Sequence, residues 1–554
     1  MTAQVRDSVR RRESLIASPH DMPRNLSLEF SLPELDRRQD TDRPYTDHAP
    51  PHNAATDSSM SWSQSLTMQQ DEDFPEYAER IFSQFMVFTV PSYLQHHITG
   101  GEPNKPKKLH DIAALDGLRG WACLLVFNFH FFFTYTWHTH IGWGFNKQYF
   151  GLHQLPFFHM IFSGHIMVAI FFVISGYVLS YRPLKTIRSG AFEQTFAVLS
   201  SATFRRGLRL YIPSIVGLFS VFVAVRLGLY NYSRWVVDHS RTITGTNEQH
   251  PIILRSTYIQ LWDWYNTICR LMNFWDWGLY YNNYNPHLWT IPVEFRSSMV
   301  LFVTILAVSR FRTKVRLILE AMTLWFCVRW GRWDVVLFLS GLILAEIDLE
   351  NGIWNNNTAT TSNCESATAP LSDLEKLVGT TSVQSLLRRR QNAIWIGIFI
   401  LGLYMGSSPN IGGLYTPGYV WLAHITPKTY PEPHRFPQTL GAVLIVASIN
   451  NSKTIQKIFV NPLSQYLGQI SYAFYIVHGP ILHGLGYTLM HNIWQITGRE
   501  TAFQFLFGAA IGWSICLPIA LWLADIFWRA VDVPSVKFAR QLESELLAKF
   551  QVSN

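Results

Sequence analysis

Long apolar stretches recur along this chain from residue 115 onward, and no other feature of the sequence constrains its fold as strongly. Each holds roughly 15 to 25 residues, the length with which an α-helix rising about 1.5 Å per residue can cross the hydrocarbon core of a bilayer. Ten such stretches lie at residues 115–136, 158–181, 208–229, 288–309, 315–331, 333–348, 393–407, 438–450, 466–490 and 502–528. The sequence therefore predicts an all-α fold, a polytopic membrane bundle of about ten transmembrane helices over residues 109–545.

The composition separates this predicted membrane domain from the two ends of the chain. Only 15% of all residues are charged, whereas about a quarter are charged in an ordinary soluble domain. Residues 1–108 differ from the rest because they are polar, rich in Asp, Arg, Ser and Pro, and hold no apolar run long enough for a signal peptide. We expect residues 1–108 to form a disordered cytoplasmic tail and residues 546–554 a short cytoplasmic end.

Basic residues give an independent test of the topology, because Lys and Arg gather in cytoplasmic loops. They occur in every second connection, near residues 105–108, 182–209, 310–316, 388–390, 453–457 and 529–540. We therefore expect a multi-pass membrane protein with both termini in the cytoplasm. The formal net charge of +7 then reflects topology, and we expect the lipid bilayer, not nucleic acid, as a partner.

The weakest point of this topology is the loop over residues 230–286, which it places outside. Four arginines in this loop are offset by four acidic residues, Asp238, Glu248, Asp263 and Asp276. The tryptophans and tyrosines of the loop are typical of a segment that lies at the membrane interface or folds back over the membrane domain.

The first apolar stretch carries ionisable residues, which are expensive inside a membrane and are therefore candidates for function. Arg119 and His130 are eleven residues apart, so a helix places them on one face, offset by about 20° and separated by roughly 16 Å along the axis. Asp116 can pair with Arg119 across three residues. This geometry suits a long substrate with its phosphate at Arg119 and its reactive end at His130. The alternative is that Arg119 snorkels and His130 only packs.

The fourth stretch begins with a second polar group. His287 and Glu294 are two helical turns apart and share a face, with Trp289 between them. Because this stretch enters from the outer side, we expect Glu294 at a depth not far from His130, where it needs a histidine, an arginine or a substrate hydroxyl as its partner. The alternative is a helix-packing ion pair with Arg296 or with another span.

Two further stretches contribute polar residues to the predicted cavity. In the ninth, Tyr475 and His478 precede a Gly-Pro pair that would free backbone carbonyls for a cavity or a neighbouring helix. In the second, Ser175 stands beside Gly176, a small residue at which another helix can approach closely. Helix packing is the alternative to substrate binding for both groups, and it is the favoured interpretation at Ser175.

In order, spacing and predicted topology, these motifs resemble those of the acyltransferase 3 family of integral membrane acyltransferases. The resemblance covers roughly residues 110–530 and rests on four motifs: Leu115-Asp116-Gly117-Leu118-Arg119-Gly120 with His130, Ile174-Ser175-Gly176-Tyr177, His287-Leu288-Trp289 with Glu294, and Ser471-Tyr472 through Tyr475 to His478 and Pro480. Two departures concern the geometry around the acceptor. Phe295 stands where many bacterial members have a second acid, and Pro213 lies one residue later than in the common bacterial spacing.

The resemblance implies an O-acyltransferase, usually of acetyl groups, with ten or so helices and acyl-CoA as the cytoplasmic donor. It also implies that Arg119 and His130 are the family's Arg and His pair and that Glu294 is the acid of its conserved motif. The family's basic loop then corresponds to Arg205, Arg206 and Arg209.

We therefore expect His130 to act as general base on an acceptor hydroxyl, or to receive the acyl group itself. Glu294 would orient or activate the acceptor or the histidine, and His478 completes the expected catalytic group. The phosphates of acetyl-CoA or another acyl-CoA would bind Arg119 and the three arginines of the basic loop. The expected substrate cavity is lined by Asp116, Ser175, His287, Trp289 and Tyr475.

The expected reaction needs no metal, and the five cysteines show no CxxC spacing that would predict a zinc site. No glycan-binding domain is recognised in the sequence, so we expect a small hydroxylated metabolite as acceptor, as in secondary-metabolite biosynthesis. Acylation of a glycan or a lipid is one alternative. A secondary transporter, in which buried charges form a proton or substrate path, is another.

Overall fold

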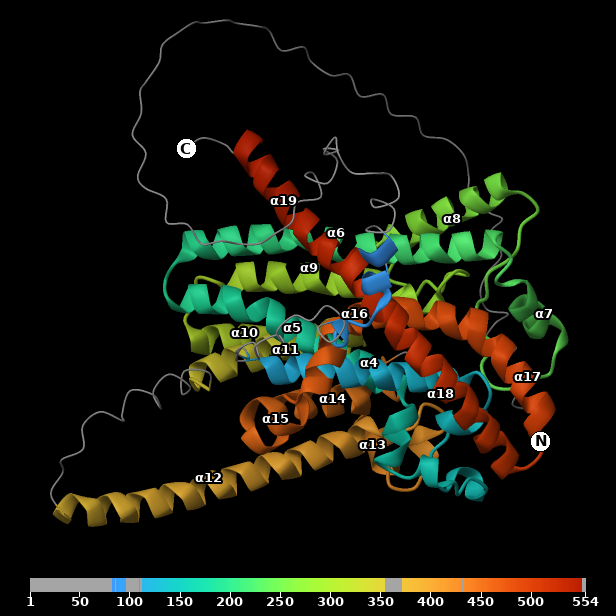
Figure 1. Ribbon diagram of the computed structural model, residues 1–554. Helices are drawn as coiled ribbons and strands as arrows, with labels where there is room; N and C mark the ends of the chain where they lie inside the picture. Colours follow the sequence, from blue (N-terminus) through green and yellow to red (C-terminus); the bar gives the residue numbers. More distant parts are fainter. Residues whose placement is uncertain are drawn as a thin grey trace, which may run out of the picture. The chain divides into compact units, whose positions relative to one another are not determined.

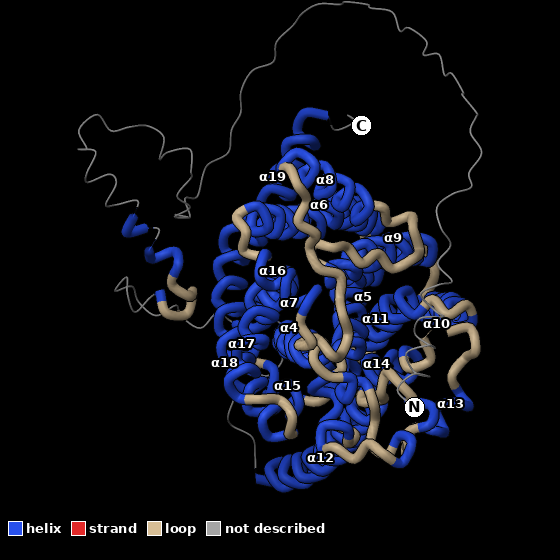
Figure 2. The backbone as a smooth tube through the Cα atoms, turned by 90° about the vertical axis from the view of Figure 1, so that its right-hand side faces the viewer, coloured by secondary structure: helices blue, strands red, loops and turns tan. Residues whose placement is uncertain are grey.

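The computed structural model describes residues 82–84, 86–95, 109, 112–353, 371–430 and 432–550. Its contacts divide the chain into residues 1–73, which lie outside that set, and residues 74–554. The described part of the second unit is helical, and the one bridge found in it joins Ile141 and Ile411 (Figures 1 and 2). The predicted all-α fold is confirmed. Most of the predicted tail over residues 1–108 falls outside the described residues.

Helices follow one another along the whole described chain. The longer ones are α4 (Ala113–Phe133), α5 (Gly164–Arg188), α6 (Phe192–Arg226), α8 (Thr257–Met272), α9 (Thr290–Val308), α10 (Thr313–Arg329), α11 (Trp333–Glu350), α12 (Leu371–Gly406), α14 (Arg435–Asn451), α16 (Pro462–Ile481), α17 (Tyr487–Thr497), α18 (Ala502–Phe527) and α19 (Val533–Phe550). The short ones include η2 (Trp137–His140), η5 (Phe158–Phe162), α7 (Asn231–His239), η6 (Pro286–Trp289), α13 (Val420–Ile425), α15 (Lys453–Phe459) and the π-helical turns η9 (Leu482–Gly486) and η10 (Trp528–Asp532).

Each of the ten predicted apolar stretches overlaps one of these helices, although two differ in detail. The second begins at Gly164 because the residues before it form the separate turn η5 and an extended Ser163. The ninth is interrupted by η9, which separates α16 from α17. Four segments are long and apolar enough to cross a membrane: Gly164–Arg188, Phe192–Arg226, Pro286–Val308 and Ala502–Phe550. Ten crossings are not confirmed, because the other stretches are too short or too polar by the same measure.

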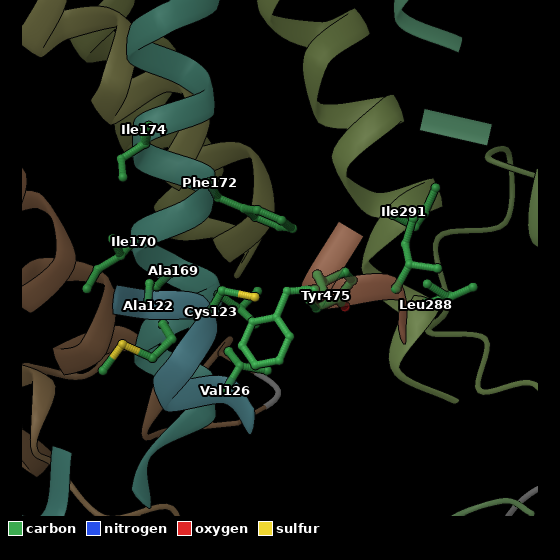
Figure 3. Close-up of a cluster of buried hydrophobic side chains, with 14 of the residues drawn as sticks. Ala122, Cys123, Val126, Ala169, Ile170, Phe172, Ile174, Leu288, Ile291 and Tyr475 are labelled. Atoms are coloured by element: carbon green, nitrogen blue, oxygen red, sulfur yellow. The ribbon is translucent and has the colours of Figure 1, made fainter. Parts of the chain in front are cut away.

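Small residues let the central helices pack closely around α4. A Cβ atom at Gly120 would lie 2.4 Å from the backbone nitrogen of Gly468 in α16, and one at Gly176 would lie 2.2 Å from the carbonyl oxygen of Phe338 in α11. The close helix approach predicted beside Ser175 is therefore confirmed. Figure 3 shows the apolar core that α4, α5, η6, α9 and α16 share, which includes Ala122, Cys123, Val126, Ala169, Ile170, Phe172, Ile174, Leu288, Ile291 and Tyr475.

The loop between α7 and α8 folds back over the C-terminal end of α4. The backbone nitrogens of Gly245 and Thr246 donate to the carbonyl oxygens of Thr134 and Phe133, each at 2.9 Å. A Cβ atom at position 245 would lie only 2.0 Å from the Phe133 oxygen, so this approach requires glycine. The loop thereby carries Glu248 into the interior.

Candidate functional site

Three predicted histidines meet in one buried group, the inner histidine cluster. His130 comes from α4, His287 from η6 and His478 from α16. The ring centroids of His130 and His287 are 3.7 Å apart, those of His287 and His478 are 4.7 Å apart, and those of His130 and His478 are 5.4 Å apart. The structure therefore brings together residues that lie far apart in the sequence.

Glu248 joins this cluster, although the sequence analysis treated it only as a counter-charge in an outer loop. Its carboxylate lies 3.0 Å from Nε2 of His287, 3.5 Å from Nδ1 of His130 and 3.3 Å from Nε2 of His483. Burial raises the pKa of Glu248, but the charges of His287 and His130 outweigh it and hold that pKa well below its ordinary value. Glu248 is therefore an ionised carboxylate among histidines.

The turn η6 positions His287 through a set of specific hydrogen bonds. Pro286 occupies its first position, where the missing N–H costs nothing. The side-chain amide of Asn285 donates to the carbonyl oxygen of Ile476 at 2.9 Å. The hydroxyl of Tyr475 bonds the carbonyl oxygen of His287 and lies 2.7 Å from the hydroxyl of Thr290. Tyr475 thus supports the site by fixing the His287 backbone.

The ring nitrogens of the cluster are only partly used within the protein. Nδ1 of His478 lies 3.2 Å from the carbonyl oxygen of Phe474, which leaves Nε2 without a hydrogen-bond partner among the described residues. Nδ1 of His130 also makes no hydrogen bond among the described residues, because its 3.5 Å distance to the Glu248 carboxylate is longer than an ordinary hydrogen bond. Such contacts often tighten only when substrate binds.

Glu294 lies in a different contact group from His130. Its Oε1 atom accepts from Nη2 of Arg206 at 2.6 Å and from the hydroxyl of Ser175 at 3.1 Å. The structure therefore gives Glu294 an arginine partner, and this pair with α6 is also the helix-packing ion pair with another span that the sequence left open. A pair with Arg296 is not formed, because Arg296 pairs with a different acid, Asp334, at 3.2 Å. His287 lies in η6 and Glu294 in α9, seven residues and about 10 Å further along the helix axis, which accounts for the separate contacts.

The four predicted arginines lie near one another, and each has an acidic neighbour. The predicted pair of Arg119 and Asp116 is present at 3.5 Å, and Arg119 also donates to the hydroxyl of Ser471 at 2.9 Å. Arg205 pairs with Glu543 of α19 at 3.1 Å. Arg209 interacts electrostatically with the three other arginines and with Asp532.

The remaining predicted cavity residue, Trp289, has an aromatic and a cationic neighbour. Its ring contacts Trp333 with centroids 6.3 Å apart, and the guanidinium of Arg435 lies 5.8 Å from its centroid. Ser175, as described, bonds Glu294. Of the other predicted cavity residues, His287 and Tyr475 lie at the inner histidine cluster, whereas Asp116 lies at Arg119.

Two overlapping groups of the cluster have the geometry to hold a metal ion. One consists of His130, His287 and His478, and the other of Glu248, His287 and His483. In each group the potential ligand atoms all lie within 4.8 Å of one another. The same atoms can perform acid-base chemistry without a metal.

A histidine beside an ionised carboxylate, enclosed by apolar helices, defines a site for proton or group transfer. The model of the Acyl_transf_3 family, an acyltransferase domain, matches residues 112–529, so the chain belongs to that family. The resemblance found in the sequence is confirmed. The chain is an acyltransferase that moves groups other than amino-acyl groups, and its apolar helices fit a membrane protein.

Fungal relatives cover most of the chain. It is 31% identical over 472 residues to the O-acetyltransferase PaAT-1 of Phomopsis amygdali. This alignment covers 82% of this chain and 88% of the relative. It is 26% identical to the acyltransferase R4 of a Phoma species, over 71% of this chain and 83% of the relative. It is 27% identical to the acyltransferase clz18 of Cochliobolus lunatus, over 69% of this chain and 81% of the relative. No solved structure matches the chain.

Proposed function

We propose that this protein is a membrane-bound O-acetyltransferase that moves the acetyl group of acetyl-CoA to a hydroxyl of a small metabolite. The observation that carries the proposal is the pairing of His130 with the ionised carboxylate of Glu248 inside a buried histidine cluster. The relative PaAT-1, which is named an O-acetyltransferase, supports the choice of an acetyl group and a hydroxyl acceptor.

In the direct form of the reaction, His130 removes the proton of the acceptor hydroxyl while the oxygen attacks the thioester carbonyl. The carbon–sulfur bond breaks, and the thiolate of CoA receives the proton from His130, so that ester and free CoA are the products. Glu248 holds the imidazole in one orientation and stabilises its protonated form. General base catalysis of this kind contributes about 10²- to 10⁴-fold in rate.

In the two-step form, His130 receives the acetyl group before the acceptor does. The unprotonated ring nitrogen attacks the thioester carbonyl, the carbon–sulfur bond breaks, and the CoA thiolate takes the proton of the other ring nitrogen. The acceptor hydroxyl then takes the acetyl group and returns its proton to the His130 imidazole. Both forms need the same two residues. They differ in whether an acetylated protein accumulates without acceptor.

The donor is proposed to bind at the arginine group on α4 and α6. Arg119 lies about 16 Å from His130 along α4, a separation that suits a long donor with phosphates at one end and a thioester at the other. Arginine is suited to phosphate because its planar guanidinium donates in pairs. In this proposal the phosphates compete with Asp116 and Glu543 for Arg119 and Arg205.

The proposed acceptor is a small molecule because the reaction centre is enclosed. The side chain of His130 is 13% exposed and that of His287 only 1%. Such a site favours a small hydroxylated metabolite, of the kind acylated in secondary metabolism, over a polymeric glycan. Acylation of a lipid or glycan by the same chemistry, and secondary transport, are the competing functions.

The test is to incubate the purified protein with labelled acetyl-CoA and a panel of small alcohols, lipids and oligosaccharides. We expect labelled ester with a small alcohol. A transporter would produce no ester, and label found only in lipid or glycan would replace the proposed acceptor class. Comparing metabolites of a deletion strain with those of its parent, and looking for the loss of one acetyl unit, identifies the acceptor.

A further inference from the structure

A second group of polar side chains lies outside the proposed reaction centre, where α5 and α14 begin. His165 is the second residue of α5, while Glu432 and His434 come just before α14. One potential ligand atom from each of the three lies within 4.8 Å of those from the other two. We propose that His165, Glu432 and His434 bind a divalent transition metal ion, for which Zn²⁺ is the best match. We refer to these three residues as the outer triad.

The distances between the donor atoms fit a shared metal ion better than a hydrogen bond. Nε2 of His434 and Oε2 of Glu432 are 3.3 Å apart, yet Nε2 makes no hydrogen bond among the described residues. Two ligands that each lie about 2.0–2.1 Å from tetrahedral Zn²⁺ are themselves separated by about 3.3 Å. The His165 ring faces the same place, with its centroid 5.0 Å from that of His434 and the ring planes at 82°.

The neighbours of the outer triad resemble those that usually orient metal ligands. The second oxygen of Glu432, Oε1, accepts from Nη2 of Arg435 at 3.1 Å, which leaves Oε2 for the metal. The Arg435 guanidinium is itself held 4.2 Å from the centroid of the Trp333 ring. Nδ1 of His165 lies 3.0 Å from the amide of Asn410, which leaves its other ring nitrogen for the metal.

The outer triad is accessible from solvent. Glu432 is 38% exposed, so an ion can enter from solvent. Two histidines and one carboxylate leave the fourth tetrahedral position open to water.

The outer triad adjoins the reaction centre without being part of it. The ring centroid of Phe129 lies 5.5 Å from that of His165 and 5.1 Å from that of His130. A metal ion at the outer triad would link the start of α5 to the residues just before α14 and stabilise their packing beside Phe129. The proposal is independent of the acetyl acceptor and donor.

The experiment measures cobalt binding to the full chain in detergent, after a chelator has removed bound metals. Co²⁺ serves as the probe because it replaces Zn²⁺ and absorbs visible light when tetrahedral. We expect one Co²⁺ per chain at the triad, and loss of its signal in His165→Ala, His434→Ala and Glu432→Gln. Asn410→Ala should weaken binding by about 10- to 100-fold. His153→Ala, a half-buried histidine outside the triad, is the matched control.

The inner histidine cluster supplies the competing outcome, because its residues have metal-binding geometry too. If the cobalt signal disappears in His130→Ala but persists in His165→Ala and His434→Ala, the metal belongs to the inner cluster and the proposal is overturned. The absence of any cobalt signal overturns it as well. Glu432→Gln keeps the shape of its side chain, so a loss of signal there is not explained by misfolding.

Discussion

Replacing Glu248 with glutamine removes the carboxylate that contacts His130, and it retains the size of the side chain. The carboxylate lies 3.5 Å from Nδ1 of His130. At an effective dielectric constant of about 20, a carboxylate stabilises an imidazolium at that distance by about 5 kcal/mol. Because the glutamine oxygen can still accept a hydrogen bond, the loss is smaller, and we expect kcat to fall about 10²- to 10³-fold.

The assay is the initial rate of labelled acetyl transfer at saturating acetyl-CoA, with the yield of folded protein measured for each variant. Glu500→Gln, which changes an exposed acid, is the control and should keep the full rate. Since the pKa of Glu248 lies well below its ordinary value, the wild-type carboxylate stays ionised at neutral pH. The deficit of Glu248→Gln should therefore persist between about pH 6 and 8. A kcat within about threefold of the wild type refutes the proposed role of Glu248.

Three further variants test other parts of the account. Arg119→Ala should raise the KM for acetyl-CoA by at least about tenfold with a smaller change in kcat, and an unchanged KM would exclude a phosphate contact. Glu294→Gln removes the acidic partner of Arg206, so unfolding should require about 1–3 kcal/mol less free energy, and kcat should fall less than in Glu248→Gln. An unchanged thermal midpoint would contradict the pairing. Gly245→Ala should displace the loop that carries Glu248 and lower kcat by about 10²-fold, whereas Gly397→Ala, which meets no atom within 4 Å, should not.

The sequence predicted the helices and the residues of α4 well, for a physical reason. Apolar stretches of sufficient length have to form helices when their backbone is removed from water. Within a helix the spacing also decides which side chains share a face, so the contact between Asp116 and Arg119 followed directly from it. His130 and His478 were found because each interrupts an apolar stretch with an ionisable group, and His287 because it directly precedes one.

The partner of His130 could not be predicted in the same way. Glu248 lies in a loop, where neither helical spacing nor the cost of burial in a membrane is visible in the sequence. Only the tertiary approach at Gly245 places it inside. Glu294 was predicted near His130 from an estimate of depth, but depth along α9 does not fix which neighbouring helix a side chain faces, and α6 supplies Arg206 there. The outer triad depends on a contact between α5 and a loop more than 260 residues later.

The acetyl transfer rate of His130→Ala tests the central claim most directly. The variant is compared with the wild type at equal amounts of folded, membrane-inserted protein, using labelled acetyl-CoA and the acceptor found for the wild type. The account predicts that ester formation falls to the level of a sample without enzyme, because both forms of the reaction require the His130 imidazole. Ester formation at the wild-type rate would contradict it.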